Sequence, residues 1–202
     1  MPDDHRTDAP HFEGSELAGK RVAFLVANEG VEQVELTAPW SAVREAGGEP
    51  ALVAPGPDPV QAFNHLDKGD RFPVDRTTAQ ADPAQFDALV LPGGVANPDQ
   101  LRLDAAAVAF VRSFFDAAKP VAVICHGPWT LVEADVVRGR TVTSWPSLQT
   151  DLRNAGATWV DRELVDDDGL ITSRKPDDLP AFCRALVKVV QEGQPAHRAR
   201  AA

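Results

Sequence analysis

Cysteine is scarce in this sequence, and it is not arranged for crosslinks or metals. The 202-residue chain has two cysteines, Cys125 and Cys183, with no CxxC pair and no pair of histidines four residues apart. A disulfide framework needs several cysteines, and a zinc cage needs ligands in close pairs. We therefore expect reduced thiols, no metal site and no cofactor.

Long apolar runs and an excess of positive charge are also missing. No stretch approaches the roughly 20 apolar residues that a membrane span needs, and residues 1–5 lack the basic and then apolar pattern of a signal peptide. The formal charge is -10 and the pI is near 4.9, so nucleic acid and anionic membranes repel the chain. We expect a soluble, cytoplasmic protein whose partners are small molecules or proteins.

The two ends of the chain differ from its middle. Residues 1–18 are polar and rich in Asp and Pro, and residues 192–202 have no apolar period, whereas the whole chain is 44% hydrophobic. That length and content suit one domain with a full core. The sequence predicts a mobile arm at 1–18, a folded domain at 19–191 and a mobile tail at 192–202.

Inside the folded domain, strand-like and helix-like segments alternate. Short apolar runs predict strands, and apolar residues three or four positions apart predict helices. Strands are expected at 21–27, 51–54, 88–91, 121–124, 141–143, 158–160, 164–165 and 170–172, a hairpin of 60–65 and 72–74 around 68–70, and helices at 33–46, 105–118, 147–155 and 177–190. This alternation predicts an α/β fold with a mostly parallel central sheet that is covered on both faces.

Ligands in such folds bind beyond the carboxyl ends of the strands. Three segments follow strand ends, at residues 28–35, 92–99 and 125–129, and they should converge. Cys125 follows the apolar run 121–124 and precedes His126-Gly127-Pro128, where a tight turn would present its sulfur to a ligand. A buried core cysteine is the alternative and the commoner fate of a free cysteine, and it is the one expected for Cys183.

Four segments resemble the PfpI branch of the ThiJ/PfpI superfamily. They are residues 27–36 (ANEGVEQVEL), 88–94 (ALVLPGG), 119–129 (KPVAVICHGPW) and 139–147 (GRTVTSWPS), and the similarity extends over about 20–190. The resemblance implies a flavodoxin-like three-layer sandwich with a cysteine on a nucleophile elbow. Members of that branch are described as intracellular proteases, glyoxalases, deglycases acting on methylglyoxal-modified proteins, and general stress proteins.

The resemblance also implies partners for the sulfur. The amides of the turn and the adjoining helix end would favour a Cys125 thiolate by lowering its pKa. Glu32 matches the family's carboxylic acid, which would donate a hydrogen bond to the thiolate when protonated. Glu29 and Glu35 lie close in sequence, and the choice of Glu32 rests on counting along residues 27–36. A surface glutamate on a solvated turn is the alternative.

His126 is the candidate general base or acid, because histidine titrates near neutral pH. The other histidines are His5, His11 and His197 near the ends and His65 in the hairpin, where a solvated side chain is expected. Glutamine amidotransferases of similar architecture need a histidine well downstream of the cysteine, and only the tail has one. Glutamine hydrolysis is therefore disfavoured.

The resemblance assigns further residues around this pair. In protease-like members the residue that orients the histidine comes from an adjacent subunit, at the position of Asp99. This implies a homo-oligomer. The alternative is that Asp99 only begins the next short helix. Gly94 and the His126 amide would form an oxyanion hole, beside Gly93. Trp129 and Trp145 would line the pocket, although packing is the commoner role of such aromatics.

Two classes of function follow. The first is a stress-response, cysteine-dependent hydrolase, either a protease or a deglycase or glyoxalase for methylglyoxal adducts, in which Cys125 adds to a carbonyl group and His126 moves the proton. Its substrates would be small carbonyl compounds, peptides or proteins. The second is a non-enzymatic redox-responsive stress protein or chaperone, in which an exposed Cys125 thiol is oxidised to sulfenic or sulfinic acid. Both classes use the same residues.

Overall fold

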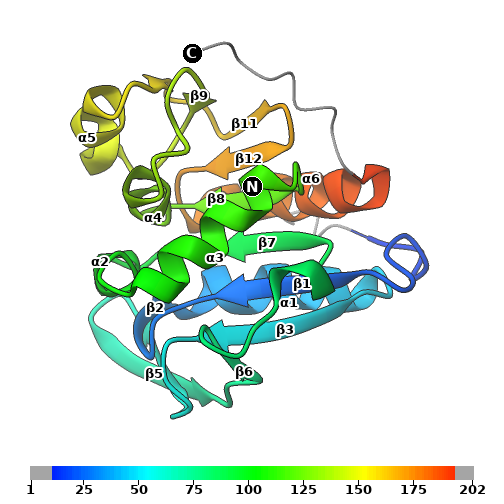
Figure 1. The fold of residues 1–202 in the computed structure, drawn as a ribbon. Helices are drawn as coiled ribbons and strands as arrows, with labels where there is room; N and C mark the ends of the chain where they lie inside the picture. The colour runs from blue at the N-terminus through cyan, green and yellow to red at the C-terminus, as the bar shows by residue number, and fades with distance from the viewer. Residues whose placement is uncertain (1–10, 194–202) are drawn as a thin grey trace, which may run out of the picture.

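The computed structural model of the chain describes residues 11–193, which are arranged around a seven-stranded sheet (Figure 1). The strand order is β11-β12-β8-β7-β1-β3-β6, and every neighbouring pair is parallel except β11 and β12. The strands are β1 (Arg21–Leu25), β3 (Glu49–Ala54), β6 (Arg76–Thr77), β7 (Ala88–Leu91), β8 (Val121–Ile124), β11 (Leu164–Asp167) and β12 (Leu170–Ser173). The expected α/β fold with a mostly parallel central sheet is confirmed.

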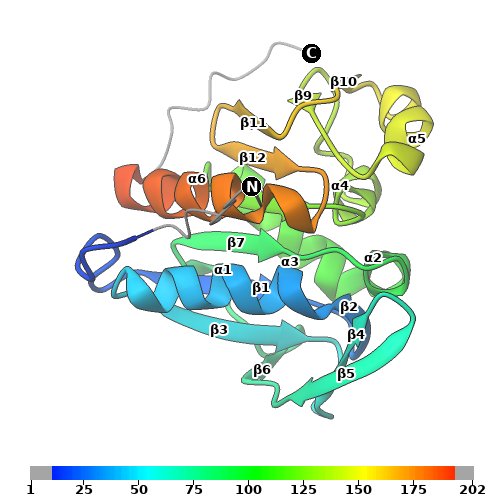
Figure 2. The same ribbon diagram turned by 180° about the vertical axis from the view of Figure 1, so that it is seen from behind.

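Helices cover both faces of the sheet. Figure 2 shows α1 (Gln33–Glu45) and α6 (Leu179–Glu192) in front of the sheet, and Figure 1 shows α3 (Ala105–Asp116) on the opposite face. The shorter helices are α2 (Ala96–Leu101), α4 (Pro128–Glu133) and α5 (Gln149–Asn154), with 3₁₀ turns at Pro83–Gln85, Pro146–Leu148 and Pro176–Asp178. The result is a three-layer sandwich.

The apolar strands hold these layers together because successive side chains point to opposite faces. On β1, Phe24 packs in the core under α1 and α6, and its ring lies 5.1 Å from that of Trp40. The next residue, Leu25, packs in the core under α3 with Phe110 and Phe114. Burial of each such side chain stabilises the fold by about 1.5–3 kcal/mol. This is why the strands read as continuous apolar runs.

Two small sheets flank the main one. One contains β2 (Glu29–Glu32), β4 (Val60–Asn64) and β5 (Asp67–Phe72), and the other pairs β9 (Thr141–Val142) with β10 (Thr158–Trp159). The expected hairpin exists, but its turn lies at His65 and Leu66, because Asn64 pairs with Asp67 and His65 adopts a positive φ of 57°. The segment 68–70, expected as the turn, belongs to β5. Its Gly69 lies against the side chain of Gln33.

The expected boundary of the N-terminal arm also needs correction. Leu17, placed in the arm, is fully buried, and its N–H donates to the Ala46 carbonyl at 2.8 Å. Residues 1–10 and 194–202, on which most of the two expected arms fall, lie outside the described residues. Among the described helices, none is long and apolar enough to span a membrane.

The main sheet brings the segments after β1, β7 and β8 to the same edge, because these neighbouring strands run parallel. β2 follows β1 and leads into α1, α2 follows β7, and α4 follows β8. Gly94 approaches the backbone of β2, and Glu32 N–H faces the Gly93 carbonyl at 3.4 Å. The three segments expected to converge therefore meet at one place.

Candidate active site

Cys125 occupies a strained turn between β8 and α4. Its φ is 61°, a left-handed conformation that is rare for residues other than glycine and costs about 1–3 kcal/mol. Two hydrogen bonds fix the turn: Cys125 N–H donates to the Ser173 carbonyl at 3.0 Å, and Trp145 N–H donates to the Cys125 carbonyl at 2.8 Å. Strain that is held in this way directs a side chain, and here it directs the sulfur into a cavity.

The carboxyl group beside the sulfur belongs to Glu35, in the first turn of α1. Glu35 is fully buried, its Oε2 accepts the Gly93 N–H at 2.9 Å, and its side chain interacts with the Cys125 thiol. Its Oε1 is buried with no hydrogen-bond partner among the described residues. Burial raises the pKa of Glu35 to about 8, although the bonds to Cys125 and Gly93 oppose the rise. Glu35 is therefore mostly a neutral carboxylic acid at pH 7.

The expectation that Glu32 lies next to the sulfur is corrected. Glu32 precedes α1, and its Oε2 accepts the His65 N–H at 3.1 Å at the cavity rim. Glu35 instead lies on the buried face of the helix with Leu36 and Pro39. A glutamate within the apolar stripe of a helix is a signal that the sequence contained, and it separates Glu35 from its neighbours.

Cys125 is more buried than a simple exposed nucleophile, with 7% of its surface accessible. Burial and the Glu35 carboxylate raise the pKa of the Cys125 thiol, while the amides of Gly94 and His126 lower it. The expected net lowering is therefore not found, because desolvation outweighs the turn amides. Cys125 and Glu35 form a coupled pair, so a proton on Glu35 removes the repulsion that a thiolate would meet.

His126 lies against the sulfur from the other side. Its Nδ1 is 3.2 Å from Cys125 Sγ, and its Nε2 is 3.5 Å from Ser147 Oγ. The imidazole stacks on the Trp145 ring, with centroids 5.7 Å apart, and meets the edge of Trp129. Burial lowers the pKa of His126 to about 4, so the ring is neutral at pH 7. A neutral Nδ1 without a proton is an acceptor for the thiol S–H.

The glycine pair brings backbone amides to the sulfur. A Cβ at Gly93 would lie 2.5 Å from Glu35 Oε2 and 2.6 Å from Cys125 Cβ, so no other residue fits there. Gly94 has a φ of 82° and sits against the backbone of β2. The backbone amides of Gly94 and His126 face the sulfur and lower the pKa of the Cys125 thiol. An oxyanion hole needs converging N–H groups of this kind, and this role for the two amides stays a prediction.

Two other expected site residues lie away from the sulfur within this chain. Asp99 is exposed on α2, and none of the hydrogen bonds between described residues joins it to His126. The Trp129 Nε1–H donates to Asp151 Oδ2 at 2.8 Å, so this ring supports His126 rather than the cavity wall. Trp145, in contrast, does line the cavity.

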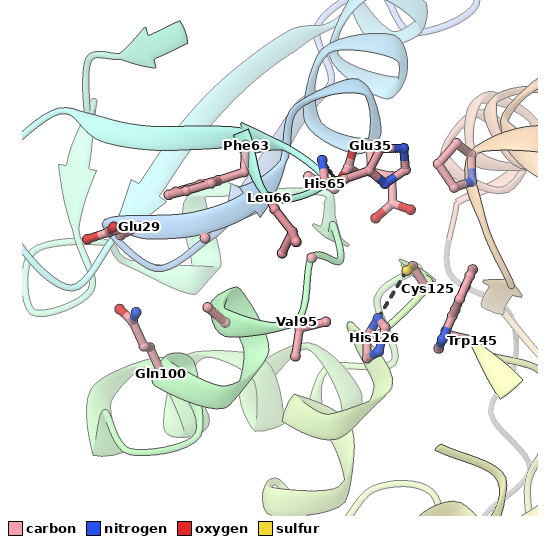
Figure 3. A pocket seen from close by; sticks show the side chains of 15 residues that line it. Glu29, Glu35, Phe63, His65, Leu66, Val95, Gln100, Cys125, His126 and Trp145 are labelled. Atoms are coloured by element: carbon pink, nitrogen blue, oxygen red, sulfur yellow. Dashed lines mark hydrogen bonds between the residues drawn. The ribbon is translucent and has the colours of Figure 1, made fainter. Parts of the chain in front are cut away.

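The cavity has a volume of about 470 Å³ and extends well beyond Cys125 (Figure 3). Sequence reasoning missed most of its wall, because the hairpin β4–β5 reaches it only through tertiary folding. Within the described range, no cluster of three His, Cys, Asp or Glu side chains could hold a metal ion. The missed lining residues are Glu29, Gly30, Phe63, His65, Leu66, Val95, Ala96, Gln100 and Pro176.

Comparisons with known proteins agree with this architecture. A model of the DJ-1/PfpI family matches residues 20–189. Deglycase PfpI of Pyrococcus furiosus is 43% identical over 171 residues, which cover 85% of this chain and 99% of that protein. Protein/nucleic acid deglycase 2 of Escherichia coli is 42% identical over 175 residues, covering 85% and 98%. The putative cysteine protease YraA of Bacillus subtilis is 36% identical over 172 residues, covering 85% and 99%.

Solved structures share the fold. The crystal structure of Drosophila melanogaster DJ-1beta has a TM-score of 0.76 and 27% identity, with 86% of this chain and 94% of that one covered. A two-domain protein of Anabaena variabilis, with DJ-1/ThiJ/PfpI-like and ferritin-like domains, has a TM-score of 0.78 and 35% identity, with 84% of this chain and 49% of that chain covered.

Proposed function

The chain belongs to the DJ-1/PfpI family, and from that premise we propose that it is a cysteine-dependent hydrolase of the deglycase type. In this reaction, a methylglyoxal adduct and one water give the free amine and a hydroxy acid. The observation that carries the proposal is the convergence of the Cys125 sulfur, the Glu35 acid, the His126 imidazole and two amides in one cavity. Relatives named deglycases are 43% and 42% identical to this chain.

The geometry supports a defined first step. Cys125 Sγ forms a bond to the substrate carbonyl carbon while the thiol proton moves to His126 Nδ1, 3.2 Å away. The carbonyl oxygen gains the electron pair and faces the Gly94 and His126 amides. The proton on His126 or the proton on Glu35 is then transferred to the amine nitrogen, because an amine leaves readily only when it is protonated.

A peptidase is the second candidate, and the relative named a putative cysteine protease favours it. A peptidase triad would need a carboxylate at His126 Nε2, where this chain has Ser147 Oγ at 3.5 Å. Asp99 would have to come from a second copy, so this candidate requires a homo-oligomer. Light scattering tests that requirement, since a monomer at assay concentration removes Asp99 from the site.

The redox alternative is less well supported by the environment of the thiol. Oxidation to sulfenic acid starts from an accessible thiolate. Here the sulfur is buried, and both burial and Glu35 raise the pKa of Cys125. A cytoplasmic location and a role in stress response remain predictions.

One experiment separates these functions. The wild type, Cys125→Ala, Glu35→Gln and the control Cys183→Ala are assayed on free methylglyoxal, on a methylglyoxal-treated peptide and on unfolded casein. A deglycase releases the peptide amine with wild type and Cys183→Ala, loses this activity with Cys125→Ala and keeps a reduced activity with Glu35→Gln. Cleavage of casein alone would support the peptidase. No turnover of any substrate, together with a peroxide-driven sulfinate on Cys125 in the intact mass, would overturn the hydrolase.

A further inference from the structure

The cavity carries charge of one sign. Three carboxyl groups line it, those of Glu29, Glu32 and Glu35, and neither Lys nor Arg is among its lining residues. Within the described part of the chain, no Lys or Arg forms a salt bridge with any of the three. Since Glu35 is mostly protonated at pH 7, the negative charge lies on Glu29 and Glu32.

These two carboxylates lie at different places along the cavity. Figure 3 shows Glu29 and Gln100 at the end away from Cys125 and Trp145. Glu32 is fixed at the rim by the hydrogen bond that it accepts from the His65 N–H. A ligand that reacts at Cys125 and fills the cavity must therefore place its remote end near a carboxylate.

Apolar side chains occupy the stretch between the two ends. Phe63 and Leu66 of the β4–β5 hairpin and Val95 before α2 line the cavity between Cys125 and Glu29 (Figure 3). Leu66 is 94% exposed, so its side chain is free to contact a ligand that fills the cavity. This stretch suits an aliphatic segment.

A separate feature indicates that a ligand completes the inner end. Glu35 lines the cavity, and its Oε1 is buried without a hydrogen-bond partner among the described residues. An unpaired buried carboxyl oxygen costs about 1–3 kcal/mol, which a polar group of a bound substrate would recover. The cavity thus has a polar inner end at Cys125 and Glu35, an apolar middle and the Glu29 carboxylate at its outer end, while Glu32 lies at the rim near Glu35.

From this arrangement we propose that Glu29 and Glu32 select substrates that carry a positive charge separated from the reacting carbonyl by an aliphatic segment, and reject anionic ones. A carbonyl adduct on a basic peptide has this chemistry, whereas an adduct on a nucleotide or an acidic peptide does not. The inference rests on the proposed function in one respect only, that substrates react at Cys125.

Alkylation of Cys125 tests charge selection without requiring turnover. The probes are three N-alkyl iodoacetamides of equal chain length that end in a trimethylammonium, a hydroxyl or a carboxylate group. In each case the Sγ–carbon bond forms, iodide leaves with the bonding electron pair and the thiol proton passes to water. Peptide-level mass spectrometry gives the rate at Cys125 in the wild type, Glu29→Gln, Glu32→Gln and the double variant. Glu163→Gln, an exposed site outside the cavity, is the matched control for net charge.

We expect the cationic probe to react fastest and the anionic one slowest with the wild type. Each single cavity variant should lower the cation-to-anion rate ratio about two- to fivefold, the range for exposed charge pairs, and the double variant more. Glu163→Gln should keep the wild-type ratio, and salt should reduce the ratio. Equal rates for the three probes with the wild type, or a wild-type ratio in the double variant, would overturn the proposal.

Equilibrium binding provides a measurement that does not depend on thiol reactivity. Calorimetric titration of Cys125→Ala with pentyltrimethylammonium should show tighter binding than titration with hexanoate, and the double cavity variant should lose the difference. Equal or reversed affinities would refute charge selection. Loss of charge selection with intact adduct turnover leaves the deglycase proposal standing, and charge selection without turnover refutes only that proposal.

Discussion

Glu35 and Gly93 hold each other in place beside the sulfur of Cys125. Glu35 Oε2 accepts the Gly93 N–H at 2.9 Å, and a Cβ on Gly93 would lie 2.5 Å from that oxygen. The carboxyl group is thereby buried against the thiol without a counter-cation among the described residues. The neutral form of Glu35 is therefore favoured in the folded protein, and we expect the titration of Glu35 to affect both the stability of the fold and the activity.

The stability of the protein should fall between pH 6.5 and 8 because of Glu35. The folded state binds the Glu35 proton more tightly, so this contribution is complete below the ordinary pKa of 4.5 and is lost as pH rises through about 8. The whole contribution is on the order of 5 kcal/mol, of which about 2 kcal/mol is lost above pH 6.5. Urea unfolding of the wild type and Glu35→Gln from pH 4 to 9 measures it, and parallel curves for the two proteins would contradict it.

His126 should act on stability in the opposite direction at lower pH. Burial lowers its pKa from 6.5 to about 4, so its contribution is present above pH 6.5 and lost as pH falls through 4. Between pH 4.5 and 6.5 the two contributions partly cancel in the wild type. The stability of Glu35→Gln should therefore rise from pH 4 to 6.5 and then level off. The added substitution His126→Gln should remove that rise.

The pH dependence of kcat/KM should report the same two groups. Catalysis needs a neutral His126 to accept the thiol proton and a protonated Glu35 beside the thiolate, so activity should be lost below about pH 4 and above about pH 8. Glu35→Gln should lower the plateau and remove the alkaline limb. A wild-type alkaline limb in Glu35→Gln would assign it to another group.

The sequence correctly located the segments whose burial can be predicted from a short run of neighbouring residues. The runs of β1, β7 and β8 are apolar on both faces, because both faces of a parallel sheet are covered, and the turn at Cys125 follows directly from one of them. The sequence alone therefore located Cys125 and His126 at the turn that follows β8.

The sequence did not locate features that depend on the rotational position of a residue around helix α1 or on contacts between residues far apart in the sequence. Glu32 and Glu35 differ by three helical positions, which decides between the cavity rim and the sulfur, and a helix that begins one residue earlier or later changes the choice. Leu66 reaches the cavity through a hairpin more than 50 residues from Cys125 in sequence. No local pattern encodes that contact.

Gly94→Ala should abolish activity and destabilise the fold. Its φ of 82° is unfavourable for alanine, and an added Cβ would press on the backbone of β2. Gly19→Ala is a matched control, because Gly19 has a φ of 76° and open space around its Cα. The control should cost about 1 kcal/mol, and Gly94→Ala at least about 2 kcal/mol more. Equal losses for the two variants in urea unfolding would show that conformation alone explains the effect.

Arg174 should stabilise the loop that carries Pro176 to the cavity wall. Its guanidinium donates to both carboxylate oxygens of Asp178, at 2.9 and 3.0 Å, and Asp178 is only 2% exposed. Arg174→Met leaves that buried carboxylate without its cation and should cost about 2–3 kcal/mol. The adjacent pair of Lys175 and Asp177 has a 2.7 Å contact but is exposed.

Lys175→Met therefore serves as the control and should leave the free energy of unfolding unchanged, because exposed ion pairs contribute little. Arg174→Met should also raise KM more than it lowers kcat, since the loop shapes the cavity wall without touching the sulfur. Thermal unfolding and steady-state kinetics of both variants measure these effects. Equal destabilisation by the two substitutions would mean that burial of Asp178 does not decide the strength of the pair.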